Sequence, residues 1–405
     1  MNKSMMNTKN RSQAFFATVN RVAPTLKKNT MVFVLVVVTL MFTLFTNGKM
    51  INPANVTNLI SQNAYVFVLA TGMLLCILTG GNIDLSVGSI VCIVGAIGAT
   101  LMVKLDVNIY LAILIMIAAG TLIGTWQGFW IAYVRIPPFI VTLAGMLIFR
   151  GLSNVILDGL TISSLPESYL NLFNTFVPDI FHGPEGFNVF CMVVGVLACI
   201  IFVISQMISR NTKIKKGYEV PSFVSMIIKI VLICLAVLAF MFRLAQYNGI
   251  PTALFWVVAI ILIYAYITSK TTIGRHFYAV GGNEKATRLS GINTNRVYFV
   301  AYLNMGFLSA IAGMITMARL YSANPTAGNN YELDAIGACF IGGASAYGGI
   351  GTVPGVIIGA ILMGVINLGM NIIGVDANYQ KVVKGAVLLA AVIFDVVSKK
   401  SGKRS

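Results

Sequence analysis

Apolar runs separated by short polar segments alternate along the chain from residue 31 almost to the C-terminus. Most runs have about the 20 residues that a helix needs to cross the hydrocarbon layer of a membrane. Transmembrane helices are therefore predicted over residues 31–46, 57–79, 85–103, 109–134, 138–157, 188–207, 223–244, 252–268, 297–320 and 381–397. A glycine-rich region at 335–373 adds one or two crossings. The pattern predicts an all-α, polytopic transmembrane bundle of roughly 10 to 12 spans.

Two glycine-rich stretches interrupt this pattern: GGNIDLSVGS at 80–89 and GGASAYGGIG at 342–351. Each stands before a helix of small residues. Paired breaks, one in each half of a chain, are typical of transporters built from structural repeats. The sequence thus favours two inverted-repeat-like halves with broken helices, although glycine- and alanine-rich helices also resemble one another by composition alone.

The first stretch contains an acid, Asp84, between two apolar runs. Irregular backbone at membrane depth needs protein or water to satisfy its peptide groups. A helix break and its cap are therefore predicted at Gly80, Gly81, Asp84 and Ser86. There the Asp84 carboxylate can accept the N–H of Ser86 or Val87 and complement the positive end of the next helix. The alternative is that Asp84 binds a polar solute or a proton. A cap is favoured because it explains, without a ligand, why the acid stands just before a new apolar run.

Composition and charge support a membrane protein rather than a soluble one. Hydrophobic residues make up 58% of the chain and charged residues only 10%, whereas soluble domains carry roughly 25% charged residues. The net charge of +16 does not indicate a nucleic-acid partner, because the basic residues collect in short segments between apolar runs. Such segments mark the cytoplasmic side of a membrane protein.

Basic segments at 3–28, 210–216, 270–296 and 399–404 set the predicted topology. Placing them all inside the cell puts both termini in the cytoplasm. The predicted organisation is a cytoplasmic N-terminal segment at 1–30, a transmembrane domain at 31–397 and a basic cytoplasmic tail at 398–405. The acids expected in the outer loops are Asp158, Glu167, Asp179, Glu185, Glu332, Asp334 and Asp376.

Other polar and reactive residues receive structural interpretations. Lys229, Arg243, Arg319 and Lys384 are expected to extend toward the membrane surface, and Arg150 is expected to pair inside the bundle. The six cysteines stand singly in or beside apolar runs and are predicted to be small buried hydrophobes. His182 and His276 lie far apart in the sequence. The chain therefore offers no metal-binding or catalytic constellation.

The longest inner connection between predicted spans contains GGNEKATRLSGI at 281–292. A short helix is predicted there, in which Asn283 caps the start, Glu284 pairs with Arg288 four residues on, and Gly291 ends the helix. Ala286 and Leu289 would share an apolar face. A short helix that projects from the membrane can fit a groove on another protein. The alternative is an ordinary basic cytoplasmic loop.

Several segments together resemble a known family. They are IDLSVGS at 83–89, IPPFIVTLAGM at 136–146, FRG at 149–151, GRHFYAVGGNEKATRLSGI at 274–292, ELDAIGACFIGGASAYGGIGTVPG at 332–355 and VKGAVLLAAV at 383–392. In this order they resemble the membrane permeases of bacterial ABC importers for monosaccharides, which include ribose, galactose and xylose permeases. The added apolar pair around SRNTKIKKGYEVPS makes the chain most similar to the longer xylose and multiple-monosaccharide members.

The resemblance implies a homodimeric permease in the bacterial cytoplasmic membrane. It would work with an ABC ATPase subunit inside the cell and a sugar-binding protein outside. No cofactor is expected on this chain, and it contains no G-x-x-x-x-G-K-[ST] loop for ATP. In the resembling family the loop matching 281–292 docks on the ATPase. This implies a coupling role for Gly281, Gly282, Asn283, Glu284, Ala286, Arg288, Leu289 and Gly291.

A passage for a neutral, hydroxyl-rich sugar needs hydrogen-bonding and aromatic side chains. The candidates within spans are Gln62, Asn63, Trp126, Gln127, Trp130, Asn304 and Asn367. Each also suits an interhelical hydrogen bond or an interfacial anchor, and only the GTWQGFW context favours Gln127 as a pathway residue. Gly355, Gly359 and Gly364 are expected to permit close helix packing, with the dimer interface as one place for it.

Two other functions fit the sequence less well. An ion-coupled secondary carrier would also use broken helices, but its ion site usually needs several buried carboxylates. Only Asp84 and Asp395 are expected to be buried here. A membrane-embedded enzyme would need a convergent nucleophile, base or metal cluster, and the sequence offers none.

Overall fold

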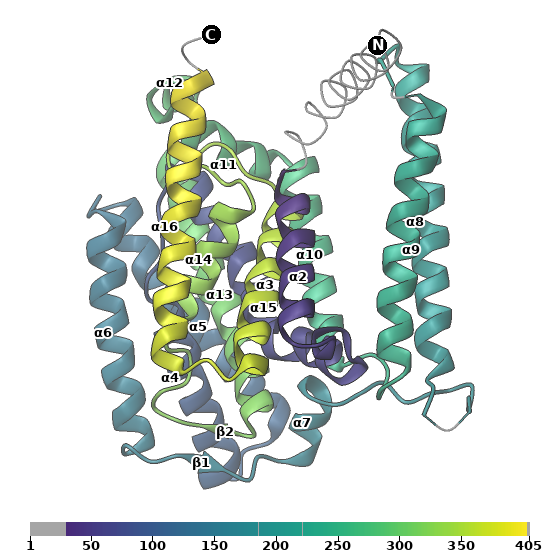
Figure 1. The fold of residues 1–405 in the computed structure, drawn as a ribbon. Coiled ribbons are helices and arrows are strands. Elements are labelled where there is room, and N and C mark those ends of the chain that lie inside the picture. Colours follow the sequence, from purple (N-terminus) through teal and green to yellow (C-terminus); the bar gives the residue numbers. More distant parts are fainter. Residues whose placement is uncertain (1–29, 185, 221, 403–405) are drawn as a thin grey trace, which may run out of the picture.

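The computed structural model describes residues 30–184, 186–220 and 222–402, which form a helical bundle (Figure 1). Nine of the described helices are long and apolar enough to cross a membrane. They are α3 (Pro53–Leu78), α4 with a π-helical extension (Val87–Lys104), α5 (Ile109–Ala132), α6 (Pro138–Leu157), α8 (Val189–Lys215), α9 (Phe223–Ala245), α10 (Thr252–Lys270), α13 (Thr294–Leu320) and α15 (Val353–Ile373). The predicted all-α transmembrane bundle is confirmed.

Three further helices complete the described bundle. α2 (Thr30–Phe45) is apolar but shorter, α14 (Tyr331–Ile341) has 11 residues, and α16 (Ala377–Gly402) carries several charged side chains. The glycine-rich region is thus the helix pair α14 and α15, joined by a loop at 342–352. The predicted N-terminal segment lies outside the described residues except for Thr30, and α16 continues into the predicted basic tail.

Two sets of five helices have opposite orientations in the bundle (Figure 1). In the set α2 to α6, the first helix begins at the end of the molecule that carries α11 (Thr272–Gly282) and α12 (Glu284–Leu289), and the following helices alternate in direction. In the second set, α10 and α13 to α16, the first helix begins at the opposite end, so each helix runs against its counterpart. Contacts repeat as well: α3 packs on α15 as α13 packs on α5, and α4 packs on α6 as α14 packs on α16. This is the inverted repeat that the sequence predicts.

Each set contains a helix that begins inside the bundle after irregular backbone. α4 follows the break at 79–86, and α14 follows the loop at 321–330. The two helix starts meet, because a Cβ added at Gly88 would lie 2.1 Å from the carbonyl oxygen of Gly328. The counterpart of the first glycine-rich stretch is therefore the loop before α14. The predicted pairing of the 80–89 stretch with the 342–351 stretch is therefore wrong. These two stretches are neighbours in space and not counterparts in the repeat.

α3 and α13 form the centre of the bundle. In their most apolar windows 89% and 72% of residues are buried. α5 reaches α13 closely at Gly124, where an added Cβ would lie 2.5 Å from the carbonyl oxygen of Tyr302. Small residues permit such backbone approach between membrane helices. Gly355, Gly359 and Gly364 also pack inside the chain, against Gly342, Ala338 and Asn63, so their small size serves internal packing.

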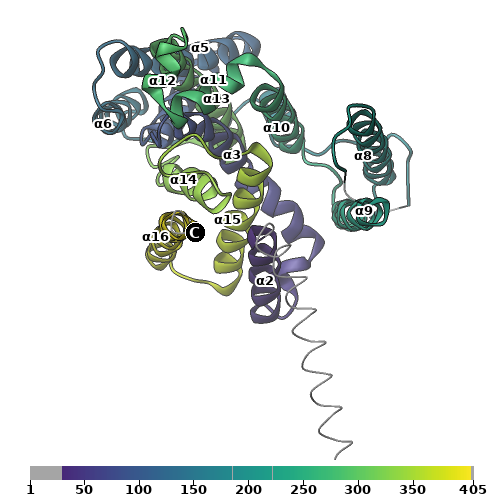
Figure 2. The same cartoon turned by 90° about the horizontal axis from the view of Figure 1, so that it is seen from above.

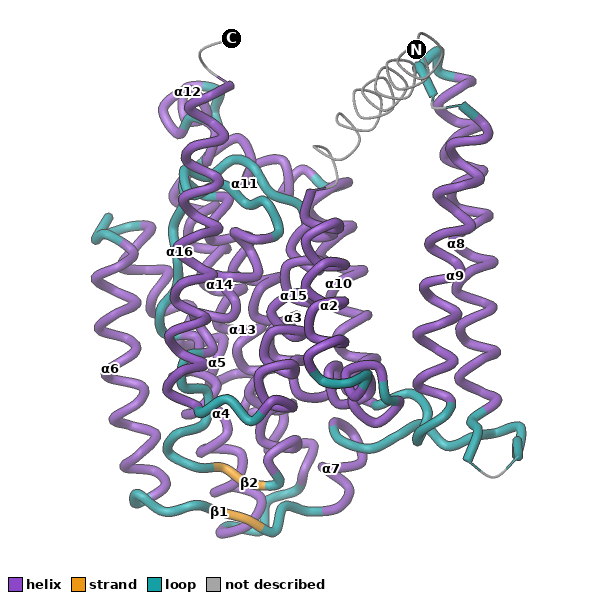
Figure 3. The backbone as a smooth tube through the Cα atoms, viewed as in Figure 1, coloured by secondary structure: helices purple, strands orange, loops and turns teal. Residues whose placement is uncertain are grey.

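Short elements lie at the end of the bundle opposite α12 (Figure 3). β1 (Ile162–Ser163) pairs with β2 (Ser322–Ala323) in an antiparallel ladder, and α7 (Glu167–Phe173) lies beside them. Asp179 ties the following loop to the start of α8, since its carboxylate accepts the N–H groups of Phe181, Gly183, Val189 and Phe190. Desolvation acts to raise the pKa of Asp179, but these hydrogen bonds outweigh it and lower the pKa below its ordinary value.

Candidate coupling and translocation site

The short helix predicted at 283–291 is α12, and it stands on the outside of the bundle end. The Asn283 side chain accepts the N–H of Ala286 at 3.0 Å, which satisfies one of the unpaired donors at the helix start. Gly291 follows the helix with a φ of +85°, the left-handed conformation that glycine adopts readily. Leu289 is 90% exposed. The helix therefore presents an apolar side chain to whatever lies beyond the bundle.

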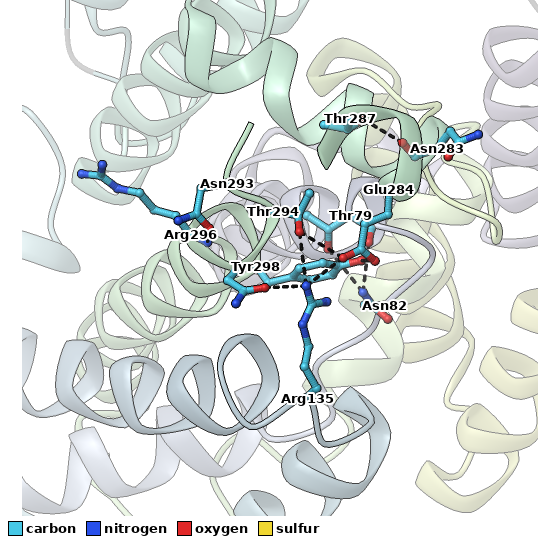
Figure 4. Close-up of polar contacts among 11 residues, drawn as sticks. Thr79, Asn82, Arg135, Asn283, Glu284, Thr287, Asn293, Thr294, Arg296 and Tyr298 are labelled. Carbon is cyan, nitrogen blue, oxygen red and sulfur yellow. Dashed lines mark hydrogen bonds and ion pairs between the residues drawn. The ribbon is translucent and has the colours of Figure 1, made fainter. Parts of the chain in front are cut away.

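Glu284 fastens α12 to the bundle (Figure 4). Its carboxylate lies 2.8 Å from the guanidinium of Arg135, in the α5–α6 loop, and accepts hydrogen bonds from Thr294 and Tyr298 at 3.1 Å each. The predicted pair with Arg288 is wrong, because Glu284 faces the bundle while Arg288 is exposed. The partner that the sequence did not indicate, Arg135, also stacks over the Tyr298 ring with its guanidinium carbon 5.2 Å from the centroid.

This arrangement changes the acidity of Glu284. Burial acts to raise its pKa, but the hydrogen bond and charge of Arg135 and the hydroxyl groups of Thr294 and Tyr298 outweigh it. The pKa is therefore lowered, so the carboxylate stays ionised at neutral pH. The stabilisation that the lowered pKa represents is lost only as the pH falls through that value.

Five glycines, Gly80, Gly81, Gly281, Gly348 and Gly349, form what we term the glycine junction at the base of α12. A Cβ added at Gly281 would lie 1.8 Å from the carbonyl oxygen of Leu78 and 2.4 Å from the nitrogen of Gly349. The same two residues are hydrogen-bonded, since the Gly349 N–H donates to the Leu78 carbonyl at 3.0 Å. The end of α11, the break after α3 and the loop before α15 thus meet backbone to backbone.

Asp84 heads a buried polar network just beyond the junction. Its Oδ1 accepts the N–H of Ser86 at 2.8 Å and the Ser86 hydroxyl at 2.6 Å. The Nε2 of Gln127 in turn donates to the Ser86 hydroxyl oxygen at 2.6 Å. None of these three side chains is exposed. In this structure the network joins α4 to α5, and the Gln127 side chain is fully buried within it.

A cavity of about 400 Å³ opens at the other end of the bundle, between α3, α13 and α14. It is lined by Ser61, Gln62, Tyr65, Ile315, Thr316, Arg319, Leu320 and Tyr331. The rings of Tyr65 and Tyr331 stack with centroids 3.5 Å apart. Gln62 is the predicted pathway residue that the structure places in this cavity. Arg319, which the sequence assigned to the membrane surface, lines the same space.

The other candidate pathway residues lie elsewhere. Asn63 accepts a hydrogen bond from Asn367 at 3.3 Å, and both side chains are buried between α3 and α15. Asn304 accepts the hydroxyl proton of Tyr264 on α10. Trp126 and Trp130 make edge-on contacts with Phe149 and Phe129. Asn63, Asn304 and Trp126 thus make interhelical contacts, the alternative that the sequence left open, whereas the contact of Trp130 is to its neighbour within α5.

An ion pair beneath the cavity was missed from the sequence. Asp334, only 1% exposed, lies 2.9 Å from the ammonium of Lys384 on α16, and accepts the Tyr65 hydroxyl proton at 2.6 Å. Asp334 and Glu332 were expected in an outer loop, and Lys384 at the membrane surface. Both expectations are wrong because 331–341 forms a helix inside the bundle. Arg150 does bind inside, through the carbonyl oxygens of Pro325 and Ala327.

Inverted, broken helices around a polar cavity, with a short anchored helix presented at the opposite end, define a membrane permease. The family described as "Branched-chain amino acid transport system / permease component" matches residues 55–392. The chain belongs to this family of ABC transporter permeases.

Named relatives extend the similarity over nearly the whole chain. The xylose transport system permease protein XylH of Escherichia coli K12 is 37% identical over 370 residues, covering 91% of this chain and 92% of that protein. XylH of Haemophilus influenzae is 36% identical over 91% of this chain and 96% of its own length. The ribose import permease protein RbsC of Escherichia coli K12 is 34% identical, with coverages of 91% and 94%. No solved structure matches the chain significantly.

These matches establish the type of protein. It is a multi-pass membrane permease of the ABC sugar-importer type, a non-catalytic transport subunit of a family without bound cofactors. The family works with an ATPase subunit and a binding protein, so neither ATP hydrolysis nor the capture of solute has to reside on this chain.

Proposed function

We propose that this chain forms the translocation pathway for a monosaccharide, xylose or a related pentose or hexose, and that α12 receives the force for transport from an ABC ATPase in the cytoplasm. The observation that carries the proposal is the position of α12. Its exposed face bears Leu289, while its base is fastened by the Glu284–Arg135 pair and by the glycine junction. A push on α12 would reach both the break after α3 and the loop before α15.

The cavity near the opposite end suits a sugar delivered from outside. Stacked tyrosine rings offer apolar faces, and Gln62, Ser61 and Thr316 offer hydrogen-bonding groups for hydroxyls. The relatives named for xylose and ribose transport both carry pentoses, which supports a substrate of this size. The proposal includes a second copy of the chain in the transporter and places both termini in the cytoplasm, on the side of α12.

The Glu284→Lys variant tests the coupling role. Both side chains of the Glu284–Arg135 ion pair are more than a third exposed. Loss of the pair should therefore lower the stability of the folded state by only about 0.2–1 kcal/mol. Sugar uptake should fall roughly tenfold or more, which corresponds to about 1.4 kcal/mol in the rate-limiting barrier, because a lysine beside Arg135 repels α12 from its seat. Uptake and ATP hydrolysis are measured together in proteoliposomes containing the permease, its ATPase and its binding protein.

Two further variants make this test specific. Exchanging the charges in the double variant Arg135→Glu/Glu284→Arg should restore part of the uptake. Glu219→Lys makes the same charge change in the α8–α9 loop and should leave uptake unchanged. Uptake at the wild-type rate in Glu284→Lys would remove α12 from the mechanism. Uptake driven by an ion gradient, without any ATPase, would contradict the whole proposal.

The cavity has its own test in Gln62→Leu. Losing the amide should reduce sugar uptake by up to about tenfold, since one hydrogen bond contributes roughly 0.5–1.5 kcal/mol, while the amount of permease in the membrane stays the same. Gln206→Leu is the matched control, because Gln206 lies on α8, away from this cavity. Equal uptake by both variants would show that sugar does not contact Gln62.

A further inference from the structure

The helices α8 and α9 form a hairpin that stands apart from the rest of the bundle (Figure 2). In their most apolar windows only 11% and 6% of residues are buried. The hairpin is attached at one end, where Cys191, Met241 and Leu244 pack with Val56 and Leu254. Figure 1 shows that this attachment lies opposite the end that carries α12. At the end of the molecule that carries α12, the hairpin therefore lies apart from the helices of the bundle.

A cavity of about 730 Å³ lies at that unsupported end. Along α8 its lining alternates between isoleucines, Ile201, Ile204 and Ile208, and hydroxyl side chains, Ser205, Ser209 and Thr212. Basic residues follow at the end of the helix. Lys213 and Lys216 come from the hairpin, and Lys270 comes from the end of α10. The cavity therefore touches both the hairpin and the bundle, with isoleucines and hydroxyl side chains along α8 and a cationic rim at the end of that helix.

The cations of the rim are available to an anionic ligand. The ion pairs among the described residues, Arg135–Glu284 and Lys384–Asp334, do not involve the three rim lysines. The α8–α9 loop contains one described acid, Glu219, beside several lysines. A smaller cavity next to the rim adds Lys229. The positive charge gathered here exceeds the negative charge of the same loop.

We propose that the cavity between α8 and α10 binds an anionic phospholipid of the cytoplasmic leaflet. The phosphate lies among Lys213, Lys216 and Lys270, the hydroxyls of α8 contact the glycerol region, and an acyl chain lies along the isoleucines. Basic pockets between membrane helices on the cytoplasmic side bind such headgroups, and the volume lies within the range of about 300–1,000 Å³ found for ligand sites. The bound lipid joins the free end of the hairpin to the bundle.

Charge and depth favour a lipid over an acidic protein partner. The isoleucine part of the cavity lies along a membrane-spanning helix, where a soluble protein does not reach. A zwitterionic lipid would fill the same space, but its ammonium group would meet the lysine rim with the wrong sign. The inference rests on the proposed topology, which places this end of the bundle at the cytoplasmic face.

The test uses the full-length permease in nanodiscs of phosphatidylcholine, with or without phosphatidylglycerol. Phosphatidylglycerol should raise the thermal unfolding midpoint of the wild type, and Lys213→Ala/Lys216→Ala should lose most of that rise. The double variant should also bind phosphatidylglycerol roughly 30-fold more weakly in native mass spectrometry, from about 1 kcal/mol per lysine. Lys49→Ala/Lys104→Ala removes two charges at the opposite end and should behave as the wild type.

Two other outcomes would contradict lipid binding at this cavity. Equal rises for the two double variants would overturn the proposal, as would a loss of ATPase binding by Lys213→Ala/Lys216→Ala with its lipid response intact, which would identify an acidic protein partner. None of these measurements needs sugar or ATP, so a failed lipid site is distinguishable from a failed transport function. Labelling of a cysteine placed in the α8–α9 loop, from each side of the membrane, tests the topology separately.

Discussion

Replacing Gly281 by alanine is expected to destabilise the permease by roughly 3 kcal/mol or more, at the upper end of the cost of overpacking. The new methyl group would overlap the carbonyl oxygen of Leu78 at 1.8 Å and the nitrogen of Gly349 at 2.4 Å. Both are backbone atoms, and they are hydrogen-bonded across the junction, so neither can move aside cheaply. Thermal unfolding of the purified permease in detergent measures the loss.

The adjacent glycine supplies the control. An added Cβ at Gly282 meets nothing within 4 Å, and alanine is the better helix former by about 0.8–1.0 kcal/mol in a helix interior. Gly282→Ala should therefore unfold at the wild-type temperature or slightly above it. A wild-type melting temperature for Gly281→Ala would show that the junction is loosely packed and does not transmit movement from α12.

Asp334→Asn is expected to lower the free energy of unfolding by about 3–5 kcal/mol, because it leaves the buried ammonium group of Lys384 without a negative partner. Asp334 is 1% exposed and the Lys384 side chain 15% exposed, and their charged atoms lie 2.9 Å apart. The neutral amide would also weaken the hydrogen bond from Tyr65, which lines the cavity between α3, α13 and α14. The measurements are the unfolding midpoint of the permease in detergent and the yield of folded protein.

A compensating change separates charge from packing. In Asp334→Asn/Lys384→Met no unpaired charge remains, so at least half of the lost stability should return. Asp376→Asn is the matched control, since Asp376 accepts the N–H of Asn378 at the exposed start of α16, where Asn and Asp cap equally well. If the double variant is no more stable than Asp334→Asn, the ion pair is not what holds α14 to α16.

The fold could be predicted largely from hydrophobic run length. Spans such as α6 and α15 consist of apolar residues that only lipid or a bundle interior accommodates, so their presence follows from the sequence. The position of α14 could not be predicted in the same way. Glu332 and Asp334 at its start give the appearance of an outer loop, and the charge that stabilises Asp334 inside the bundle comes from Lys384, 50 residues later. A lysine within an apolar run was the signal that a buried acid should be sought.

The candidate site was predictable where it depends on local sequence. Asn283 and Gly291 specify the ends of α12 through capping and backbone conformation, which neighbouring residues determine. The anchor at Arg135 depends on how two distant loops come together, and no local rule selects Arg135 over Arg288. Local sequence also failed to predict the role of Gln127. Its neighbouring tryptophans suggested a contact with sugar, but in the structure its amide donates a hydrogen bond to the Ser86 hydroxyl oxygen.

The hairpin of α8 and α9 has a further consequence for the architecture. The chain enters and leaves it at adjoining points, since the Asn188 N–H donates to the Ala245 carbonyl oxygen and the Val177 N–H to that of Ile250, both at 2.9 Å. Because those points already touch, the pair is geometrically an insertion between the two oppositely oriented sets. Permeases of this architecture could gain or lose such a module as a unit, changing their length by two helices while the framework around the sugar route stays as it was.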